Sequence, residues 1–115
     1  LLDGVKKASE RGYVLGLDKR RILVDKPHKA LNYLLQGSAA ILAKRWMVLT
    51  YEYLPPTAHQ LAFVHDELQY ECKECDREHL QFLLELKALE AGEYYNLRCP
   101  IAAESQSGAN WAEVH

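Results

Sequence analysis

Residues 62–70 read Ala62-Phe63-Val64-His65-Asp66-Glu67-Leu68-Gln69-Tyr70. An apolar run rich in β-forming residues is broken by three ionisable residues, after which apolar and polar residues alternate. This pattern predicts a β-hairpin with strands at residues 60–64 and 68–72 and a charged tip between them. Strands on both sides would fix where Asp66 and Glu67 point, and a metal site needs carboxylates held in this way. Charged residues in a turn are more often simply solvated, so this stretch alone leaves both interpretations open.

The length and composition are those of one ordinary globular domain. The chain has 115 residues, of which 49% are hydrophobic and 26% charged, and its formal net charge is −2. No overall basic field indicates a nucleic-acid partner, so such a contact has to come from a local patch. No run is apolar enough to cross a membrane and no signal peptide is recognisable. Three cysteines without secretory features favour the reducing cytoplasm.

The N-terminal part predicts a helix followed by a small hairpin. Residues 1–11 have the pattern of an amphipathic helix, and because the chain begins inside it without a methionine, we expect a longer parent protein. Strands are predicted at residues 13–17 and 21–24. The turn between them holds the most basic patch of the chain, Lys19, Arg20 and Arg21. A solvated turn and a contact with backbone phosphates explain this patch equally well.

A long helix is predicted from residue 28 to about residue 53, with Pro27 in its first turn. One face carries side chains spaced four residues apart, namely His28, Asn32, Gln36, Ala40 and Lys44. Gly37 inside this helix costs about 1 kcal/mol relative to alanine, so we expect a helix, a strand or a ligand backbone to pack closely against it. The row is consistent with a face laid against a polar ligand, although such residues are usually just solvated.

The C-terminal half predicts a second helix and a final strand. The helix is expected at residues 76–93, with Asp76 as its N-cap and Gly92 as its stop. Residues 94–101 predict an edge strand, and Trp111 is expected to hold down a loop-like tail. The resulting fold class is α+β, a small antiparallel sheet with the two long helices packed on one face.

Other motifs in the chain favour no separate chemistry. The Cys72-Lys73-Glu74-Cys75 spacing suggests zinc or redox chemistry, but the remaining Cys99 lies far along the chain. The pair also stands at a strand end, not at the start of a helix as in thioredoxin-like units. No glycine loop is followed by the Lys-Ser or Lys-Thr that would cradle a phosphate.

The remaining features are consistent with metal-dependent chemistry on a nucleic acid. Magnesium is commonly held by one or two carboxylates together with substrate phosphates, and Asp66 would supply such a carboxylate. A two-metal phosphoryl-transfer site needs a further carboxylate, and the chain offers no obvious second member.

Ordered motifs resemble those of the family A (DNA polymerase I-like) DNA polymerases. Val64-His65-Asp66-Glu67 resembles motif C of that family, and the preceding helix is similar from Asn32 through Gln36-Gly37-Ser38-Ala39-Ala40 to Lys44. Replicative polymerases of short-tailed bacteriophages share further runs: Gly16-Leu17-Asp18, Pro27-His28-Lys29-Ala30-Leu31-Asn32-Tyr33-Leu34-Leu35-Gln36, and Asn110-Trp111-Ala112 with His115. Ile41 stands where DNA polymerase I proper has an acidic residue, as expected for the phage branch. The resemblance covers nearly the whole chain.

The resemblance implies roles for individual residues. Asp66 would be the metal-binding aspartate that helps to hold two Mg²⁺ ions, Glu67 a less critical acidic neighbour, and His65 would approach the primer terminus. Uncharged donors would contact the minor groove of the primer–template, where correct base pairs offer similarly placed acceptors. These donors would be Gln36, Asn32 and, with less support, His28. Arg20 and Arg21 of the basic turn are the candidates for phosphate contacts.

The resemblance also implies what surrounds the chain. Residues 1–115 would be the C-terminal part of a polymerase palm that ends at His115, with the exonuclease domain, thumb, motif A and fingers upstream. The parent would be a DNA-directed DNA polymerase acting in the host cytoplasm if viral. Its partners would be primer–template DNA, deoxynucleoside triphosphates, the rest of the chain and a processivity factor bound through the thumb. We expect the isolated chain to be inactive, and the alternative is a non-catalytic nucleic-acid-binding module derived from the palm. A lone-metal hydrolase is a distant third, because its ligands cannot be placed.

Overall fold

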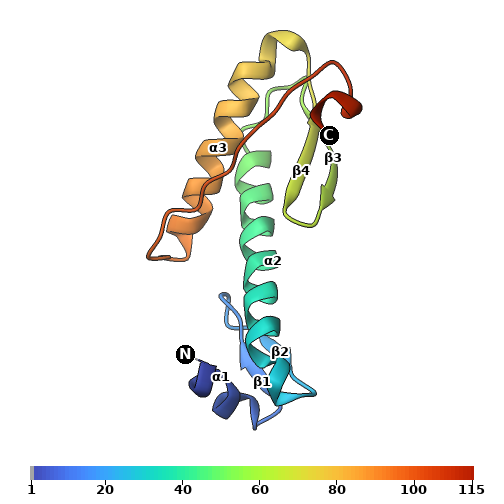
Figure 1. Ribbon diagram of the computed structural model, residues 1–115. Coiled ribbons are helices and arrows are strands. Elements are labelled where there is room, and N and C mark those ends of the chain that lie inside the picture. Colours follow the sequence, from blue (N-terminus) through green and yellow to red (C-terminus); the bar gives the residue numbers. More distant parts are fainter. Residues whose placement is uncertain (1) are drawn as a thin grey trace. The chain divides into compact units, whose positions relative to one another are not determined.

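The computed structural model describes residues 2–115. The helices and strands in chain order are α1 (Leu2–Ser9), β1 (Tyr13–Leu15), β2 (Arg21–Leu23), α2 (Ala30–Tyr51), β3 (His59–Val64), β4 (Glu67–Glu71) and α3 (Arg77–Tyr94). Short 3₁₀ turns lie at Pro27–Lys29, Glu74–Asp76 and Trp111–Val114. The chain forms two compact units, one up to Leu42 and the other Ala43–His115, and α2 begins in the first and ends in the second (Figure 1). The predicted α+β class is confirmed.

The first unit is built on the predicted N-terminal hairpin, which the structure confirms with shorter strands. Val14 pairs with Ile22 in the antiparallel ladder. The face that carries Val14 is buried, and the core of the unit consists of Val5, Val14, Val24 and Ala30. Alternation along a short strand therefore leaves the opposite face of the hairpin, which carries Tyr13 and Arg21, outside this core.

Gly37 is explained by a strand that packs against α2. A Cβ atom placed on Gly37 would lie 2.6 Å from Cδ1 of Ile22, a residue of β2. The close approach predicted from the sequence is thus confirmed, and of the three possible neighbours the structure shows the strand. Gly37 therefore has a packing role inside the first unit.

In the second unit α3 packs beside the last turns of α2 (Figure 1). The indole Nε1 of Trp46 donates a hydrogen bond of 2.8 Å to the carbonyl oxygen of Leu84. The guanidinium of Arg45 lies 4.0 Å from the ring centroid of Tyr94. The buried apolar side chains of α3 are Leu80, Leu83, Ala88 and Ala91. These contacts connect two elements whose positions were both predicted from helical periodicity.

The end of α3 differs from the prediction in two ways. The helix continues through Gly92 and ends at Tyr94, and Asn96, just beyond the C-cap residue Tyr95, has a φ of +55°. The amide of Leu97 donates to the Gly92 carbonyl (3.2 Å) and that of Asn96 to the Glu93 carbonyl (3.0 Å), which is the pattern of a Schellman C-cap. Gly92 is therefore not the stop, and residues 94–101 form no strand because the cap turns the chain there.

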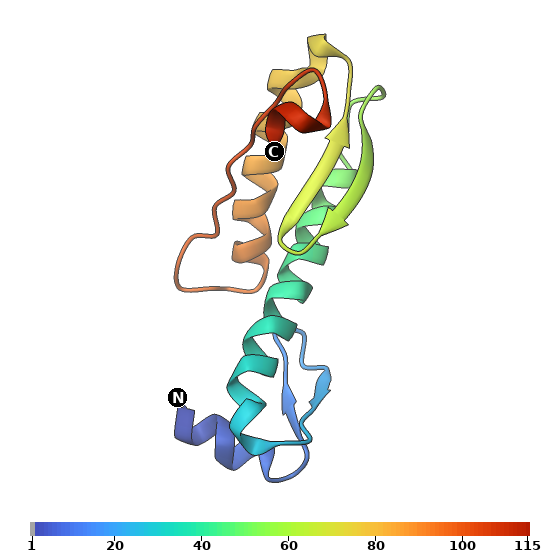
Figure 2. The same ribbon diagram turned by 45° about the vertical axis from the view of Figure 1, so that its right-hand side comes forward.

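Gly92 has a different role, which is to admit Ile101. A Cβ atom on Gly92 would lie 2.7 Å from Cγ1 and 3.1 Å from Cβ of Ile101. Past this contact the C-terminal segment runs along α3 towards the β3–β4 hairpin (Figures 1 and 2). Because residue 92 has no side chain, Ile101 can pack against α3 at this point. The C-terminal segment then runs back along the helix from there (Figure 1).

The predicted single sheet is wrong, because residues 2–115 form two separate two-stranded sheets, β1–β2 and β3–β4. Each hairpin completes its own ladder within one compact unit. In β3–β4 the ladder contains a bulge at Leu61, since Gln60 pairs with Tyr70 and Ala62 with Gln69.

One smaller expectation also changes. Asp76 does not cap α3 with its side chain, because its carboxylate accepts a hydrogen bond from the Thr57 hydroxyl. Within residues 2–115, no helix combines the length and the apolarity needed to cross a membrane.

The Gly92 contact predicts the effect of adding one methyl group. We expect Gly92→Ala to lower the free energy of unfolding by about 1–3 kcal/mol, because overpacking against Ile101 outweighs the gain in helix propensity. Urea unfolding followed by circular dichroism measures this. Gly4→Ala in α1 is the matched control, since a Cβ there meets nothing within 4 Å, and it should cause no loss. A Gly92→Ala protein as stable as the wild type would contradict the packing role.

Candidate nucleic-acid and metal site

The predicted charged hairpin is present, but its turn is one residue shorter than expected. Val64 pairs with Glu67, so only His65 and Asp66 lie outside the ladder. His65 has a φ of +57°, a left-handed conformation that few non-glycine residues adopt. Glu67 is the first residue of β4 and not part of the tip. The predicted carboxylate pair is therefore divided between a turn and a strand.

Asp66 is the more available of the two carboxylates. It is exposed at the turn, and within residues 2–115 its side chain makes no hydrogen bond or ion pair. A single unpaired carboxylate offers the hard oxygen ligands that Mg²⁺ prefers. The described part of the chain contains no cluster of three acidic, histidine or cysteine ligands. Asp66 thus fits magnesium as one ligand of a site that needs others.

Glu67 is held by two polar partners. Its Oε2 accepts a hydrogen bond of 2.8 Å from Nε2 of Gln69 and lies 3.1 Å from Nε2 of His115. The hydrogen bond from Gln69 and then the one from His115 lower the pKa of Glu67 below its ordinary value. Glu67 therefore stays ionised while its charge is shared with neighbours, which leaves it less available to a cation than Asp66.

A C-terminal hook, defined as residues 110–115, brings His115 to this position. The side chain of Asn110 accepts a hydrogen bond of 3.1 Å from the amide of Glu113 and so starts the 3₁₀ turn. The Trp111 ring stacks on the His115 ring with centroids 4.2 Å apart. Trp111 was expected to hold the tail down, but its side chain is 62% exposed and is not buried against the rest of the unit. It supports the imidazole of His115 instead.

His115 was not identified as a site residue from the sequence. Its Nε2 faces Glu67 and its Nδ1 lies 3.1 Å from the Trp111 carbonyl oxygen. Only the protonated imidazole donates to both acceptors. The hydrogen bonds to Glu67 and to Trp111 accordingly raise the pKa of His115 above its ordinary value. No local signal reveals this contact, because 48 residues separate the partners.

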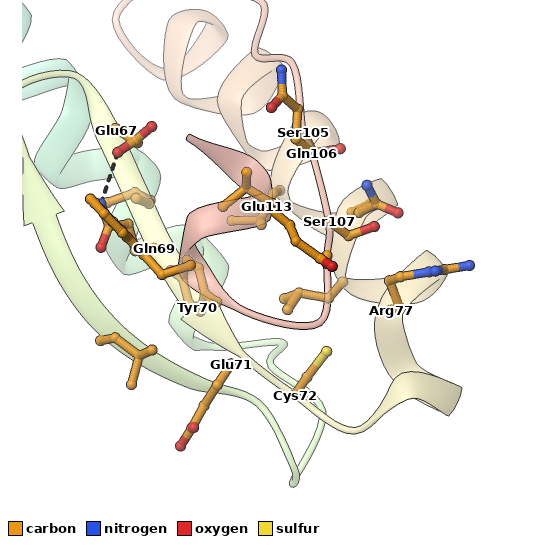
Figure 3. A pocket seen from close by; sticks show the side chains of 18 of the residues that line it. Glu67, Gln69, Tyr70, Glu71, Cys72, Arg77, Ser105, Gln106, Ser107 and Glu113 are labelled. Atoms are coloured by element: carbon orange, nitrogen blue, oxygen red, sulfur yellow. Dashed lines mark hydrogen bonds between the residues drawn. The ribbon is translucent and has the colours of Figure 1, made fainter.

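A groove of about 1020 Å³ lies between β4, α3 and the C-terminal segment (Figure 3). Both apolar and polar side chains line the groove. One of them is Tyr70, and burial raises the pKa of its hydroxyl to about 12. The charged side chains that line it are mostly acidic: Glu67, Glu71, Glu74, Glu85, Glu104 and Glu113, against Arg77 and His115. This excess of negative charge makes the groove unsuitable for a phosphate backbone.

The polar row predicted on the long helix lies in the first unit and is exposed. His28 belongs to the 3₁₀ turn before α2, and Asn32 and Gln36 follow on the helix itself. All three side chains face solvent. The structure thus keeps them available to a ligand and gives them no role in the core.

The basic turn also lies in the first unit, where its two arginines differ. Nε of Arg20 forms an ion pair of 2.8 Å with Asp18, although the Arg20 side chain is 80% exposed. The guanidinium carbon of Arg21 lies 4.7 Å from the Tyr13 ring centroid. Lys19 occupies the turn with a φ of +66°.

Charge is distributed unequally between the two units. Up to Leu42 the sequence has eight lysines and arginines against four acidic residues, and from Ala43 onward it has six against twelve. The net charge of −2 therefore conceals a basic unit and an acidic one. The excess of positive charge, which a contact with nucleic acid would use, lies in the first unit.

Comparisons with known proteins match the chain along nearly its whole length. The family model for DNA polymerase family A matches residues 3–113. The DNA-directed DNA polymerases of Enterobacteria phage T3 and Escherichia phage T7 are each 36% identical over 92% of the chain. That of Escherichia phage Phieco32 is 34% identical over 100% of it. The chain spans only 16–20% of the length of these relatives.

A solved structure has the same fold. It is the POL domain of Pol1 from M. smegmatis in complex with DNA primer-template and dNTP. The TM-score is 0.76 at 27% identity, and the match covers 87% of this chain and 20% of that one.

The contact between His115 and Glu67 predicts a pH-dependent hook. The raised pKa of His115 means that its contribution to stability is complete below its ordinary pKa and is lost as pH rises through the raised value. The lowered pKa of Glu67 means that its contribution is lost as pH falls through the lowered value. The hook should therefore be held most firmly between these two titrations.

Nuclear magnetic resonance titration of the His115 ring measures this directly. We expect its pKa to lie above the ordinary value in the wild type and to fall towards that value in Glu67→Gln. Glu71→Gln, which removes a carboxylate further along β4, should leave the pKa of His115 unchanged. An unaltered His115 pKa in Glu67→Gln would show that the contact does not form in solution.

Proposed function

The chain belongs to DNA polymerase family A, and on that premise we propose that it is the C-terminal part of the palm of a DNA-directed DNA polymerase. The family match over residues 3–113 is the observation that carries this proposal. The short span relative to the phage relatives supports a parent protein that supplies the exonuclease domain, thumb, motif A and fingers. We propose that the parent acts in the host cytoplasm.

Asp66 is the residue that would hold magnesium. Its exposed carboxylate at the rigid turn supports this role, and a second aspartate would come from motif A of the parent. When bound, Mg²⁺ would neutralise phosphate charge and activate the primer 3′-hydroxyl for attack on the α-phosphate of the nucleotide. His65, the other turn residue, would approach the primer terminus. Glu67 would support the turn through Gln69 and His115 and be less critical than Asp66.

The exposed row on the long helix would contact the minor groove of the primer–template. Gln36 and Asn32 donate hydrogen bonds without carrying charge, and His28 extends their row. Minor-groove acceptors are similarly placed in every correct base pair, so such donors check the shape of a pair without reading its sequence. Arg20 and Arg21 would contact backbone phosphates, a role that the positive charge of the first unit supports.

The partners of the complete enzyme follow from these roles. They are primer–template DNA, deoxynucleoside triphosphates, the rest of the polymerase chain and a processivity factor bound through the thumb. The chain on its own would be inactive, because one carboxylate cannot hold two metal ions in the required geometry.

The second candidate function is a non-catalytic nucleic-acid-binding module. It is favoured by the lack of a three-ligand acidic cluster within residues 2–115. A coding sequence that places a motif A aspartate and a fingers helix upstream in the same frame would support the polymerase. A start codon directly before Leu1 would support the binding module.

Replacement of Asp66 tests the catalytic proposal. In the complete polymerase, Asp66→Asn should reduce primer extension by about a hundred- to a thousandfold, because a charge that stabilises the transition state is lost. Primer–template binding, measured by fluorescence anisotropy, should change little. Glu71→Gln on the same hairpin is the control and should extend primers normally. Continued turnover by Asp66→Asn would rule out the assigned role.

Replacement of Gln36 tests the minor-groove proposal. Gln36→Ala should slow primer extension about three- to tenfold, as expected for one lost hydrogen bond. Its stability should change by less than about 0.5 kcal/mol, because the side chain is exposed. Gln81→Ala makes the same change on α3 and should leave extension unaffected. If Gln36→Ala changes stability but not primer extension, Gln36 is a solvated residue of the helix surface and has no role in binding DNA.

A further inference from the structure

Tyr13 carries two arginines on its ring. The guanidinium carbon of Arg11 lies 4.3 Å from the ring centroid, and that of Arg21 lies 4.7 Å from it. Tyr13 pairs with Leu23 and Leu15 with Arg21, so Tyr13 and Arg21 are diagonal neighbours on one face of the hairpin. Arg11 reaches the same ring from the turn between α1 and β1. Two separate stretches of chain thus direct positive charge to one ring outside the core.

Neither guanidinium has an acidic partner in the described part of the chain. No carboxylate oxygen there lies within 4.0 Å of Arg11 or Arg21. Two of the acidic side chains of this unit are engaged elsewhere, because Asp18 pairs with Arg20 and Asp25 accepts a hydrogen bond of 3.1 Å from Tyr33. Nε of Arg11 donates to the Tyr13 carbonyl oxygen at 3.2 Å, and within residues 2–115 its terminal nitrogens make no hydrogen bond or ion pair.

This arrangement is not needed to shield the ring. One stacked arginine would suffice to cover a face of the half-buried Tyr13 ring, whereas a second adds a like charge beside the same ring and costs free energy unless anions lie near. Guanidinium groups have planar sets of donors that match a phosphate. Stacking on a ring fixes those donors before the ligand arrives, so less conformational entropy is lost on binding.

We propose that Arg11 and Arg21 each bind a phosphate of a nucleic-acid backbone, with Tyr13 as the positioning residue that holds both guanidiniums. This inference rests on the proposed function, which gives the chain a DNA partner. It adds Arg11 and Tyr13 to the contact surface. It also separates Arg21, whose charge has no acidic partner within residues 2–115, from Arg20, whose charge is shared with Asp18.

The salt dependence of DNA binding by the chain tests this site. Fluorescence anisotropy would be measured against sodium chloride with a labelled DNA hairpin and, separately, labelled oligo(dT). Arg11→Gln and Arg21→Gln should each reduce the slope of log K against log[salt] by about 0.9 on the duplex or about 0.7 on the single strand, one phosphate contact each. The probe that shows the reduction identifies the strand form that supplies the phosphate. Lys6→Gln removes an exposed charge of the same unit and should leave the slope unchanged.

Substitutions of Tyr13 and a charge-conserving variant separate positioning from packing. Tyr13→Phe keeps the ring face and should bind like the wild type, whereas Tyr13→Leu should weaken binding about two- to fivefold. Arg11→Lys keeps the charge and should keep the slope. Circular dichroism would establish that each variant is folded.

Three outcomes would overturn the inference. If Arg11→Gln leaves the slope unchanged, as Lys6→Gln should, while Arg21→Gln still reduces it, the contact of Arg11 with the Tyr13 ring serves packing only. The proposed function would still stand. If Arg11→Lys is folded but reduces the salt-dependence slope as much as Arg11→Gln does, the positive charge of residue 11 does not account for the binding. If the wild-type chain binds neither probe at low salt, the DNA contact of the proposed function fails, and this site fails with it.

Discussion

The arrangement of the candidate site depends on the hydrogen-bond register of the β3–β4 hairpin. Because Val64 pairs with Glu67, the connection has only two residues, and His65 must adopt a φ of +57°. A left-handed residue of this kind costs about 1–2 kcal/mol, which the strands on both sides must offset. The same register sends Asp66 into solvent and places Glu67 on the strand face where Gln69 and His115 meet it. A slip of one residue would exchange these faces and destroy both arrangements.

The division of charge along the chain suits the proposed contact of this protein with DNA. Carboxylates repel the phosphate backbone unless a cation lies between them, so acidic and phosphate-binding surfaces are best made by different parts of the sequence. Here the residues up to Leu42 carry the excess of positive charge and those from Ala43 carry the excess of negative charge. Within the acidic unit, the contact with His115 further reduces the negative charge that Glu67 presents beside Asp66.

Local patterns in the sequence predict the elements, and contacts between distant residues decide the remainder. Period-two alternation locates both hairpins, and helical periodicity locates α2 and α3, since each signal lies within about twenty residues. The end of α3 was missed because Gly92 resembles a stop, although its lack of a side chain serves Ile101, and Asn96 makes the cap. The proposed site residue Asp66 is predicted from its motif, and Gln36 and Asn32 are predicted from their spacing. His115 could not be predicted, because nothing near it in sequence indicates that it meets Glu67 across 48 residues.

Such long-range contacts also explain why the two carboxylates of the motif are not equivalent. A carboxylate that already accepts hydrogen bonds must give them up before it can bind a cation, and this cost weakens Glu67 as a ligand. Asp66 has no such partners within residues 2–115. Magnesium keeps several waters and takes only a few carboxylates, so an exposed aspartate on a stiff turn can serve a site completed by another part of a protein. The hairpin is therefore suited to contribute one ligand, and the other ligands of the proposed two-metal site would come from elsewhere.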